Sequence, residues 1–358
     1  MLEFTPSYKK ICILRLSAIG DVTHVIPVVR AMQKQWPGVE ITWVCGKFEY
    51  KLLNIIEGIN FIIFDKKKGI KAYRELWNAL KSDHFDVLLH MQVAARANIA
   101  SLGIKADIKL GWDKSRSRDF HQLFINHSVA RENQQHQVQG FLSFARELGL
   151  QLDEPSWEIP VTEKARKFAE QYIDKDKKVL IISACSSHKL RNWSVSKYAE
   201  LADYAVEHYS MQVILSGGPA DIEVEMANEI LASMRTSALN LVGKDTLEQL
   251  VGLLSKATVV VSPDSGPAHI ANAMCVPVIG LYACTWSKRS GPYNSLEYCV
   301  DKFETAAKQY LNKSVNDLRW GTKIEKPGVM ELIEVDEVCR QLDRVIKHSS
   351  DKTSVIKE

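Results

Sequence analysis

The chain has 358 residues, of which 46% are hydrophobic and 25% are charged. This balance is that of a folded globular protein, and the length favours two domains over a single core. The formal net charge of +3 is too small to indicate a nucleic-acid partner.

The seven cysteines and the apolar runs indicate the compartment. The cysteines are scattered and form no C-x-x-C pair, which argues against a disulfide framework or a zinc site and favours a reducing cytosol. Arg15 interrupts the first apolar run, so we expect no secretory signal, and no run is long enough to cross a bilayer. The sequence therefore predicts a cytoplasmic protein without a transmembrane segment.

The first elements form a βαβ unit. Residues 10–16 predict a buried strand, residues 17–21 a turn, and the apolar residues that follow recur at helical spacing. A second strand is expected at residues 40–45. The turn lacks the G-x-G-x-x-G of dinucleotide-binding folds, which disfavours a nicotinamide or flavin cofactor. Asp21, at the mouth of the helix, is either its N-cap or a functional carboxylate.

Strands and helices alternate along the rest of the chain, which predicts an α/β protein with two mostly parallel, doubly wound sheets. The expected strands are residues 10–16, 40–45, 60–64, 85–90, 107–111, 125–129, 178–183, 211–216, 238–242, 258–262 and 277–282. We place the domains at residues 1–155 and 156–335, with the connection inside the polar segment 151–178. A last helix is expected at residues 336–347 and a disordered tail at 348–358.

The segment 259–282, VVVSPDSGPAHIANAMCVPVIGLY, carries the strongest functional signal. An apolar strand ends in a Pro-Asp-Ser-Gly turn, and a helix then opens with a proline in its first turn. The N–H groups around Ser265 and Gly266 lie at the positive end of this helix, which favours an anion, most naturally phosphate. His269 adds a further donor. Alternatively, Asp264 and Ser265 only cap the helix.

Several separated motifs resemble those of one glycosyltransferase family. They are RLSAIGD at residues 15–21, SSHKLRNW at 186–193, LSGGP at 215–219 and SGPY at 290–293. With the DSGPAH turn, they resemble the signatures of the ADP-heptose:lipopolysaccharide heptosyltransferases, glycosyltransferase family 9. The segment 317–333, DLRWGTKIEKPGVMELI, resembles the heptosyltransferase I subgroup, which adds the first heptose to a phosphorylated Kdo acceptor.

The resemblance implies the GT-B architecture, in which two Rossmann-like domains face each other across a cleft. The acceptor is expected on the N-terminal domain and the donor on the C-terminal domain, with the last helix packing back toward the N-terminal domain. It also implies a metal-independent reaction without a cofactor, in which Asp21 is the general base. With one base and no covalent intermediate, we expect inversion at the anomeric carbon. The rival carboxylates Asp113 and Asp119 match no catalytic position of the family.

The donor is expected at strand ends of the C-terminal domain, on Lys189, Arg191, Asp221, Asp264, Ser265, Gly266 and His269. Asp264 is expected to hold the turn, because its charge would repel the diphosphate. The family has lysine where this chain has Arg191, so the cation that meets the phosphates is left open between Arg191 and Lys189. Glu223 is the alternative to Asp221 for the ribose hydroxyls.

Two further features concern the donor loops. Trp286 stands where the family has an acidic residue, which leaves the donor contacts of that loop open. The D-x-D pattern at residues 174–176 lies in a charged linker, and we interpret it as solvated surface, not as a metal site.

The acceptor is expected on basic side chains of the N-terminal domain: Arg96, Lys114, Arg118 and His136. A phosphorylated, carboxylated sugar on a lipid suits them, because arginine forks match such anions geometrically. The alternative is a basic surface that attracts anionic lipid headgroups, which we favour for Lys66–Lys68.

The sequence thus predicts a heptosyltransferase that moves L-glycero-D-manno-heptose from ADP-heptose to the phosphorylated Kdo inner core of lipopolysaccharide. Its partners would be ADP-heptose and Kdo-lipid A, which it would meet as a peripheral protein at the inner face of the inner membrane. The alternatives are transfer to a later core position, a nucleotide-sugar epimerase of similar architecture, and a non-catalytic relative that binds nucleotide or lipid.

Overall fold

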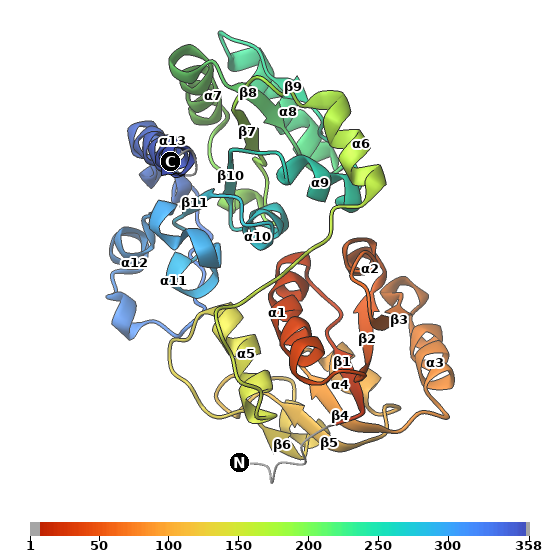
Figure 1. Cartoon of the computed structure of the whole chain (residues 1–358). Coiled ribbons are helices and arrows are strands. Elements are labelled where there is room, and N and C mark those ends of the chain that lie inside the picture. Colours follow the sequence, from red (N-terminus) through yellow and green to blue (C-terminus); the bar gives the residue numbers. More distant parts are fainter. Residues whose placement is uncertain (1–7, 356–358) are drawn as a thin grey trace. The chain divides into compact units, whose positions relative to one another are not determined.

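The computed structural model describes residues 8–355, with the backbone alone for residues 350–355. The chain divides into two units, and the boundary falls between Pro160 and Val161. In Figure 1, unit 1 runs from red to yellow and unit 2 from green to blue. The boundary lies inside the polar segment 151–178, slightly beyond the predicted residue 155.

Unit 1 is built on a six-stranded parallel sheet in the order β3-β2-β1-β4-β5-β6. Its strands are β1 (Lys10–Leu14), β2 (Glu40–Gly46), β3 (Ile59–Phe64), β4 (Phe85–His90), β5 (Ala106–Gly111) and β6 (His127–Ser128). Its helices are α1 (Ile19–Gln35), α2 (Lys47–Leu53), α3 (Ile70–Ala79), α4 (Ala95–Ser101) and α5 (Gln137–Glu147). The predicted strands of the first half are all present.

Helices cover both faces of this sheet. Cys12 and Leu14 of β1 share a buried cluster with Leu76 of α3 and Ala97 of α4. The alternate residues of β1 point to the other face, because side chains along a strand alternate. Helices α1 and α5 pack against each other. The sheet is therefore doubly wound, and apolar residues line both of its faces, as parallel sheets require.

A proline inside α1 creates an attachment point for the chain that leaves unit 1. Pro27 has no N–H to donate to the Thr23 carbonyl, four residues earlier. The indole Nε1 of Trp157 donates to that carbonyl instead, at 3.0 Å. Arg30 also donates to the carbonyls of Trp157 and Glu158, at 3.2 and 2.6 Å. The segment that precedes unit 2 is thus fastened to the side of α1.

Unit 2 repeats the same parallel sheet, in the order β12-β11-β10-β7-β8-β9. Its strands are β7 (Val179–Ile182), β8 (Gln212–Leu215), β9 (Leu239–Asn240), β10 (Val259–Pro263), β11 (Val278–Tyr282) and β12 (Val300–Asp301). Its helices are α6 (Glu163–Tyr172), α7 (Val195–Tyr209), α8 (Asp221–Ser233), α9 (Leu247–Leu254), α10 (Gly266–Ala273), α11 (Ser287–Ser290), α12 (Phe303–Leu311) and α13 (Val335–Val355). Strand β12 was not predicted.

The two units share one topology. When the strands are numbered within each unit, both sheets have the order 3-2-1-4-5-6, which is that of the Rossmann fold. In unit 2, helices α7, α8, α12 and α13 contribute to one large core cluster with β7, β8, β10 and β11. The prediction of two Rossmann-like units, as in the GT-B class of fold, is confirmed.

The last helix differs from the prediction. Helix α13 runs to Val355, so the predicted disordered tail is wrong for residues 348–355, while residues 356–358 lie outside the described residues. Its continuation past residue 347 is anchored by the Tyr298 hydroxyl, which lies 2.8 Å from His348 Nδ1. Its buried residues Val338 and Leu342 belong to the core of unit 2. The expected packing of this helix toward the N-terminal domain stays a prediction.

Two properties of the whole chain bear on its environment. The seven cysteines are all free, as the absence of a C-x-x-C pattern predicts. Within residues 8–355, no helix combines the length and the apolar character needed to span a bilayer.

Candidate active site

Each sheet has one point at which its strand order reverses, between β1 and β4 in unit 1 and between β7 and β10 in unit 2. The loops at the carboxyl ends of such a strand pair diverge and leave room for ligands. Asp21 follows β1, and Ser265 follows β10. Both sequence-predicted turns therefore lie at the place where open α/β sheets bind ligands.

Asp21 lies in the first turn of α1, and its side chain is 30% exposed. Its Oδ2 forms an ion pair with Arg15 and accepts a hydrogen bond from the Ala18 N–H at 3.3 Å. Its Oδ1 has a longer contact, 3.4 Å from Gln137 Nε2. One oxygen thus serves the capping role that we considered for Asp21, and the other is the more open of the two.

The groups that hold this turn come from the loop after β4 and from α5. Arg15 donates to the Met91 carbonyl at 2.7 Å, and its guanidinium lies 5.2 Å from the centre of the Phe141 ring. Gln92 Oε1 accepts from the N–H groups of Leu16 and Ser17, at 2.7 and 3.3 Å. These contacts fix the backbone before Asp21 and the cation beside it.

A second carboxylate, Glu49, lies near Asp21 and was missed in the sequence. Glu49 is buried in the first turn of α2. A side chain at Gly46 would meet both its carboxylate and the Leu16 carbonyl, at 2.3 and 2.5 Å. Burial raises the pKa of Glu49, and the negative charge of Asp21 acts in the same direction. Glycine at position 46 therefore allows a buried carboxyl group to pack beneath the Asp21 turn.

The predicted acceptor residues fall into two groups. His136 is the N-cap of α5, where its Nδ1 accepts from the Val138 N–H at 3.1 Å, and it precedes the Gln137 that contacts Asp21. The other group, Arg96, Lys114 and Arg118, is exposed. No hydrogen bond or ion pair links this second group to Asp21 in the described part of the chain.

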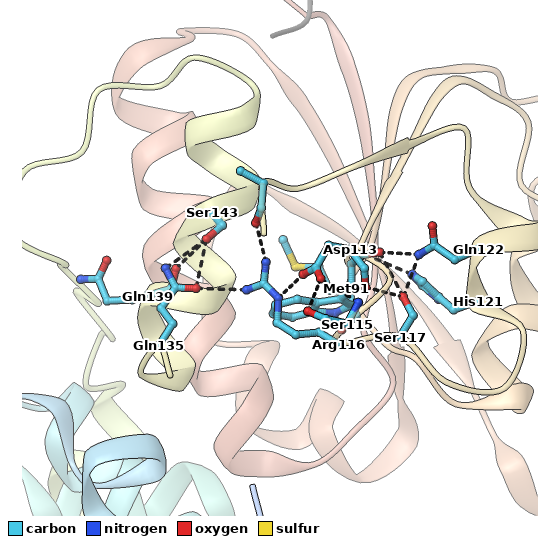
Figure 2. A network of polar contacts seen from close by, with 12 residues as sticks. Met91, Asp113, Ser115, Arg116, Ser117, His121, Gln122, Gln135, Gln139 and Ser143 are labelled. Atoms are coloured by element: carbon cyan, nitrogen blue, oxygen red, sulfur yellow. Dashed lines mark hydrogen bonds and ion pairs between the residues drawn. The ribbon is translucent and has the colours of Figure 1, made fainter. Parts of the chain in front are cut away.

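The rival carboxylates of unit 1 have structural partners. Figure 2 shows Arg116 between Asp113 and Gln135, and the guanidinium also donates to the Ala130 carbonyl at 2.7 Å. Burial alone would raise the pKa of Asp113, but hydrogen bonds from Ser115 and Arg116 hold it below its usual value. Asp119 accepts from the Ala95 N–H at 3.0 Å and so caps α4. Both carboxylates stabilise loops.

In unit 2, the Asp264 side chain points into the fold. Its Oδ1 lies 3.4 Å from His269 Nε2, and its Oδ2 accepts from the Ser290 hydroxyl at 3.2 Å. Burial alone would raise the pKa of Asp264, but His269, Thr285 and the nearby Arg191 hold it below its usual value. The His269 Nε2 thus faces Asp264 and supports the turn.

Ser265 is the N-cap of α10, and Gly266 is its first residue. The Ser265 hydroxyl is 2.7 Å from that of Ser262, so it makes no capping bond to the helix. The first N–H groups of a helix have no intrahelical partner. The start of α10 therefore offers backbone donors and the positive end of the helix dipole to an anion.

The two candidate cations of the β7 loop differ in their surroundings. Arg191 donates to Glu325 Oε1 from Nε and Nη2, at 2.8 and 2.5 Å, and its side chain is 12% exposed. It is also close enough to Asp264 to lower the pKa of that carboxyl. Lys189 is exposed. The structure thus associates Arg191, and not Lys189, with the α10 turn.

Glu223, the alternative to Asp221, faces the Gly217-Gly218 turn. It accepts from the Gly218 N–H at 2.6 Å and lines a pocket of about 230 Å³. Asp221 begins α8 and is exposed. Burial raises the pKa of the neighbouring Asp245 to about 7, and the charge of Glu223 adds to this effect. Of these three carboxyl groups, Glu223 is the one that lines the pocket beside the β8 end.

The D-x-D pattern forms a surface turn, in which Asp174 Oδ1 accepts from the Asp176 N–H at 3.0 Å. Elsewhere in residues 8–349, whose side chains are described, no three His, Cys, Asp or Glu side chains group as metal ligands do.

Comparison with known proteins identifies the family. The model of glycosyltransferase family 9 (heptosyltransferase) matches residues 73–318. The lipopolysaccharide core heptosyltransferase OpsX of Haemophilus influenzae is 42% identical over 342 residues, which cover 96% of this chain and 98% of that protein. Lipopolysaccharide heptosyltransferase 1 of Campylobacter coli is 26% identical, over 91% of this chain and 98% of that protein.

Solved structures agree on the fold. A family 9 glycosyltransferase from Veillonella parvula superposes with a TM-score of 0.80 at 19% identity, over 95% of this chain and 98% of that one. Heptosyltransferase II of Escherichia coli gives a TM-score of 0.72 at 19% identity, over 96% and 99%. With the family model and the OpsX relative, these matches lead to one assignment: the chain belongs to glycosyltransferase family 9, the heptosyltransferases.

Proposed function

We propose that this heptosyltransferase moves L-glycero-D-manno-heptose from ADP-heptose to a Kdo sugar of the lipopolysaccharide inner core, with inversion at the anomeric carbon. The observation that carries the proposal is the α10 turn. There His269 and Ser290 contact the Asp264 carboxylate, and the backbone N–H groups at the start of α10 are left for a diphosphate. The printed names of relatives support the substrates: OpsX is a lipopolysaccharide core enzyme, and Escherichia coli WaaC has been solved with ADP.

On the donor side, the developing charge of the leaving ADP needs donors and cations. We assign this role to the first turn of α10, with Ser265 and Gly266, and to Arg191. Glu223 is our choice for the ribose hydroxyls, because its carboxylate lines a pocket whereas Asp221 is exposed. These groups neutralise the diphosphate without a metal, so we expect activity to survive excess EDTA.

On the acceptor side, a hydroxyl must lose its proton as it attacks the anomeric carbon. We assign Asp21 Oδ1 as the general base and Arg15 as the residue that orients it, because Oδ2 is already engaged. His136 lies on the element that contacts Asp21. The exposed Arg96, Lys114 and Arg118 offer positive charge to Kdo-lipid A at the inner face of the inner membrane, where the protein would act as a peripheral enzyme.

The experiment supplies the purified protein with ADP-heptose, with and without a deacylated Kdo acceptor, in EDTA. We expect ADP and a heptosylated Kdo product with inverted anomeric configuration, both dependent on the acceptor. Conversion of the ADP-sugar without acceptor would indicate an epimerase. Transfer only to an acceptor that already carries heptose would indicate a later core position. Neither product would indicate a non-catalytic relative.

A further inference from the structure

Glu325 forms an ion pair between two loops of unit 2. It lies in the loop 318–329, which precedes α13, whereas its partner Arg191 lies in the loop after β7. The Glu325 Oε1 accepts hydrogen bonds from both Nε and Nη2 of Arg191. The side chains are 26% and 12% exposed, so both are largely shielded from water. A shielded pair with two hydrogen bonds has a more fixed geometry than an exposed ion pair.

The Glu325 carboxyl group is held in its charged form. Burial alone would raise its pKa, but Arg191, His188 and Lys323 hold the pKa below its usual value. The His188 Nε2 lies 4.0 Å from the second carboxylate oxygen, Oε2. A negative charge in this position would repel a diphosphate that Arg191 binds. Higher affinity for a nucleotide is therefore not what this carboxylate supplies.

Other contacts already join the two loops. Cys284, which follows β11, donates from its Sγ to the Leu190 carbonyl at 3.1 Å, and its own carbonyl accepts from the Ile324 N–H at 2.8 Å. The Trp193 indole donates to the Ile333 carbonyl at 3.0 Å, and Trp193 and Ile324 belong to the same core cluster. Because these contacts hold the loops together, the ion pair is not needed for that purpose. What it adds is a fixed orientation of the guanidinium.

The Arg191 guanidinium has further donors that Glu325 does not use. Glu325 accepts one N–H from Nε and one from Nη2, which leaves the second N–H of Nη2 and both of Nη1. Within residues 8–349, no protein group forms a hydrogen bond with Nη1. Since the guanidinium is planar, a carboxylate on its Nε edge fixes the direction of the remaining N–H groups. The guanidinium is also close enough to Asp264 to help lower the pKa of that carboxyl, so it lies near the α10 turn.

We propose that Glu325 is a positioning residue for the transfer reaction: it holds one edge of the Arg191 guanidinium so that the Nη1 edge is available to the donor diphosphate. This inference rests on the proposed function, in which Arg191 and the start of α10 meet that diphosphate. Negative charge grows on the diphosphate as its bond to the sugar breaks. A donor whose orientation is fixed in advance stabilises that charge without reorganisation. Glu325 therefore acts on the rate of transfer more than on the affinity for ADP.

The first test compares Glu325→Ala with Glu331→Ala, a matched change in the same segment, where Glu331 is 52% exposed and pairs with Lys197. We expect Glu325→Ala to lower kcat about tenfold with a deacylated Kdo acceptor, because Arg191 loses its fixed orientation. The affinity for ADP should stay within about threefold, since a mobile Arg191 still attracts the diphosphate and the repulsive charge of Glu325 is gone. Glu331→Ala should leave both quantities unchanged.

The second test uses calorimetric titration with ADP and needs no acceptor. Arg191→Lys should weaken ADP binding about tenfold, because lysine has a single ammonium group and Glu325 competes with the diphosphate for it. Adding Glu325→Gln to Arg191→Lys removes this competition and should restore the affinity to within about threefold of the parent. Glutamine has the size of glutamate, so this pair of variants remains informative if Glu325→Ala does not fold.

Three results would overturn the inference: an unchanged kcat in Glu325→Ala, a fall in its ADP affinity equal to the fall in kcat, or no recovery when Glu325→Gln is added to Arg191→Lys. The first would separate the ion pair from the reaction, and the other two would make it a support of the loops. If the ADP titrations behave as expected but the parent does not transfer heptose to Kdo, the inference stands and the proposed acceptor is wrong.

Discussion

Asp21 in unit 1 and Asp264 in unit 2 are carboxylates at the start of a helix that follows a central strand of the sheet, but their side chains have different partners. Asp264 is 16% exposed, and its two oxygens face His269 and Ser290. Asp21 is 30% exposed, and its Oδ1 has one long contact, with Gln137. A carboxylate with both oxygens engaged supports a turn, whereas one with an open oxygen can exchange a proton. Carboxylates that follow a strand beside the point of order reversal thus have different roles in the two sheets.

A substitution of Asp21 tests this difference in role directly, and we expect it to have the largest effect on turnover. Asp21→Asn should lower turnover about 100-fold or more, the range for a lost general base, and leave ADP affinity nearly unchanged. The control is Asp153→Asn, since Asp153 is 83% exposed and its ion pair with Lys34 contributes little. Rates within a few-fold of the parent would show that Asp21 is a helix cap like any other, and the base would have to be sought elsewhere, first at Glu49.

Substitutions of the two cations in the β7 loop test which of them contacts the diphosphate of the donor. Arg191→Gln should weaken ADP binding about tenfold, because it removes a charge-assisted contact and leaves Glu325 without its guanidinium partner. Lys189→Gln should change the affinity by about twofold or less, as expected for an exposed lysine without a fixed geometry. Calorimetric titration with ADP measures both. The opposite ranking would assign the diphosphate to Lys189 and make the Arg191–Glu325 pair structural.

The smallest expected effect is a difference between the two units in how their stability responds to mild acid. Burial lowers the pKa of His90 to about 3 and that of His121 to about 4, from an ordinary 6.5. The unfolded chain therefore takes up these protons first, and the stability of unit 1 falls as the pH drops from about 6.5 toward 4, by about 2 kcal/mol per ring at pH 5. In unit 2, the raised pKa of Asp245, about 7, acts in the other direction, since the folded state takes up that proton first.

Hydrogen exchange at pH 7 and pH 5 can follow each unit separately. Protection should fall in the β4 region of unit 1 and not around Asp245 in unit 2. His90→Leu removes one titrating ring and should reduce the loss in unit 1. Equal losses in both units, or no difference between parent and variant, would contradict the assignment of the acid response to the buried histidines.

Most of the fold was predictable because each strand carries its own signal. The central strands are buried on both faces and therefore read as continuous apolar runs. Strand β12 has two residues, Val300 and Asp301, too few for any periodicity. The extension of α13 was missed because it depends on the distant Tyr298, which contacts His348 and leaves no trace in the local sequence.

The candidate site was predictable where its residues are neighbours in the chain. The turns at Asp21 and Ser265 are local, so a strand followed by a helix start was enough to find them. Gln92 and Glu49 follow other strands, and Glu325 lies in the loop that precedes α13. All three meet the site only after folding. The choice between Asp221 and Glu223 depends on the rotation of α8, because residues two apart on a helix point to different sides.

The attachment of Trp157 to α1 limits the length of connecting chain that is free of side-chain anchors. The chain passes from unit 1 to unit 2 once. On one side, Arg30 holds the Glu158 carbonyl. On the other side, the Thr162 hydroxyl caps α6 and donates to Glu248 at 2.6 Å. Residues 159–161 therefore lie between the two anchors, and Pro160 among them has a fixed φ. The covalent link between the two units is thus short and conformationally restricted.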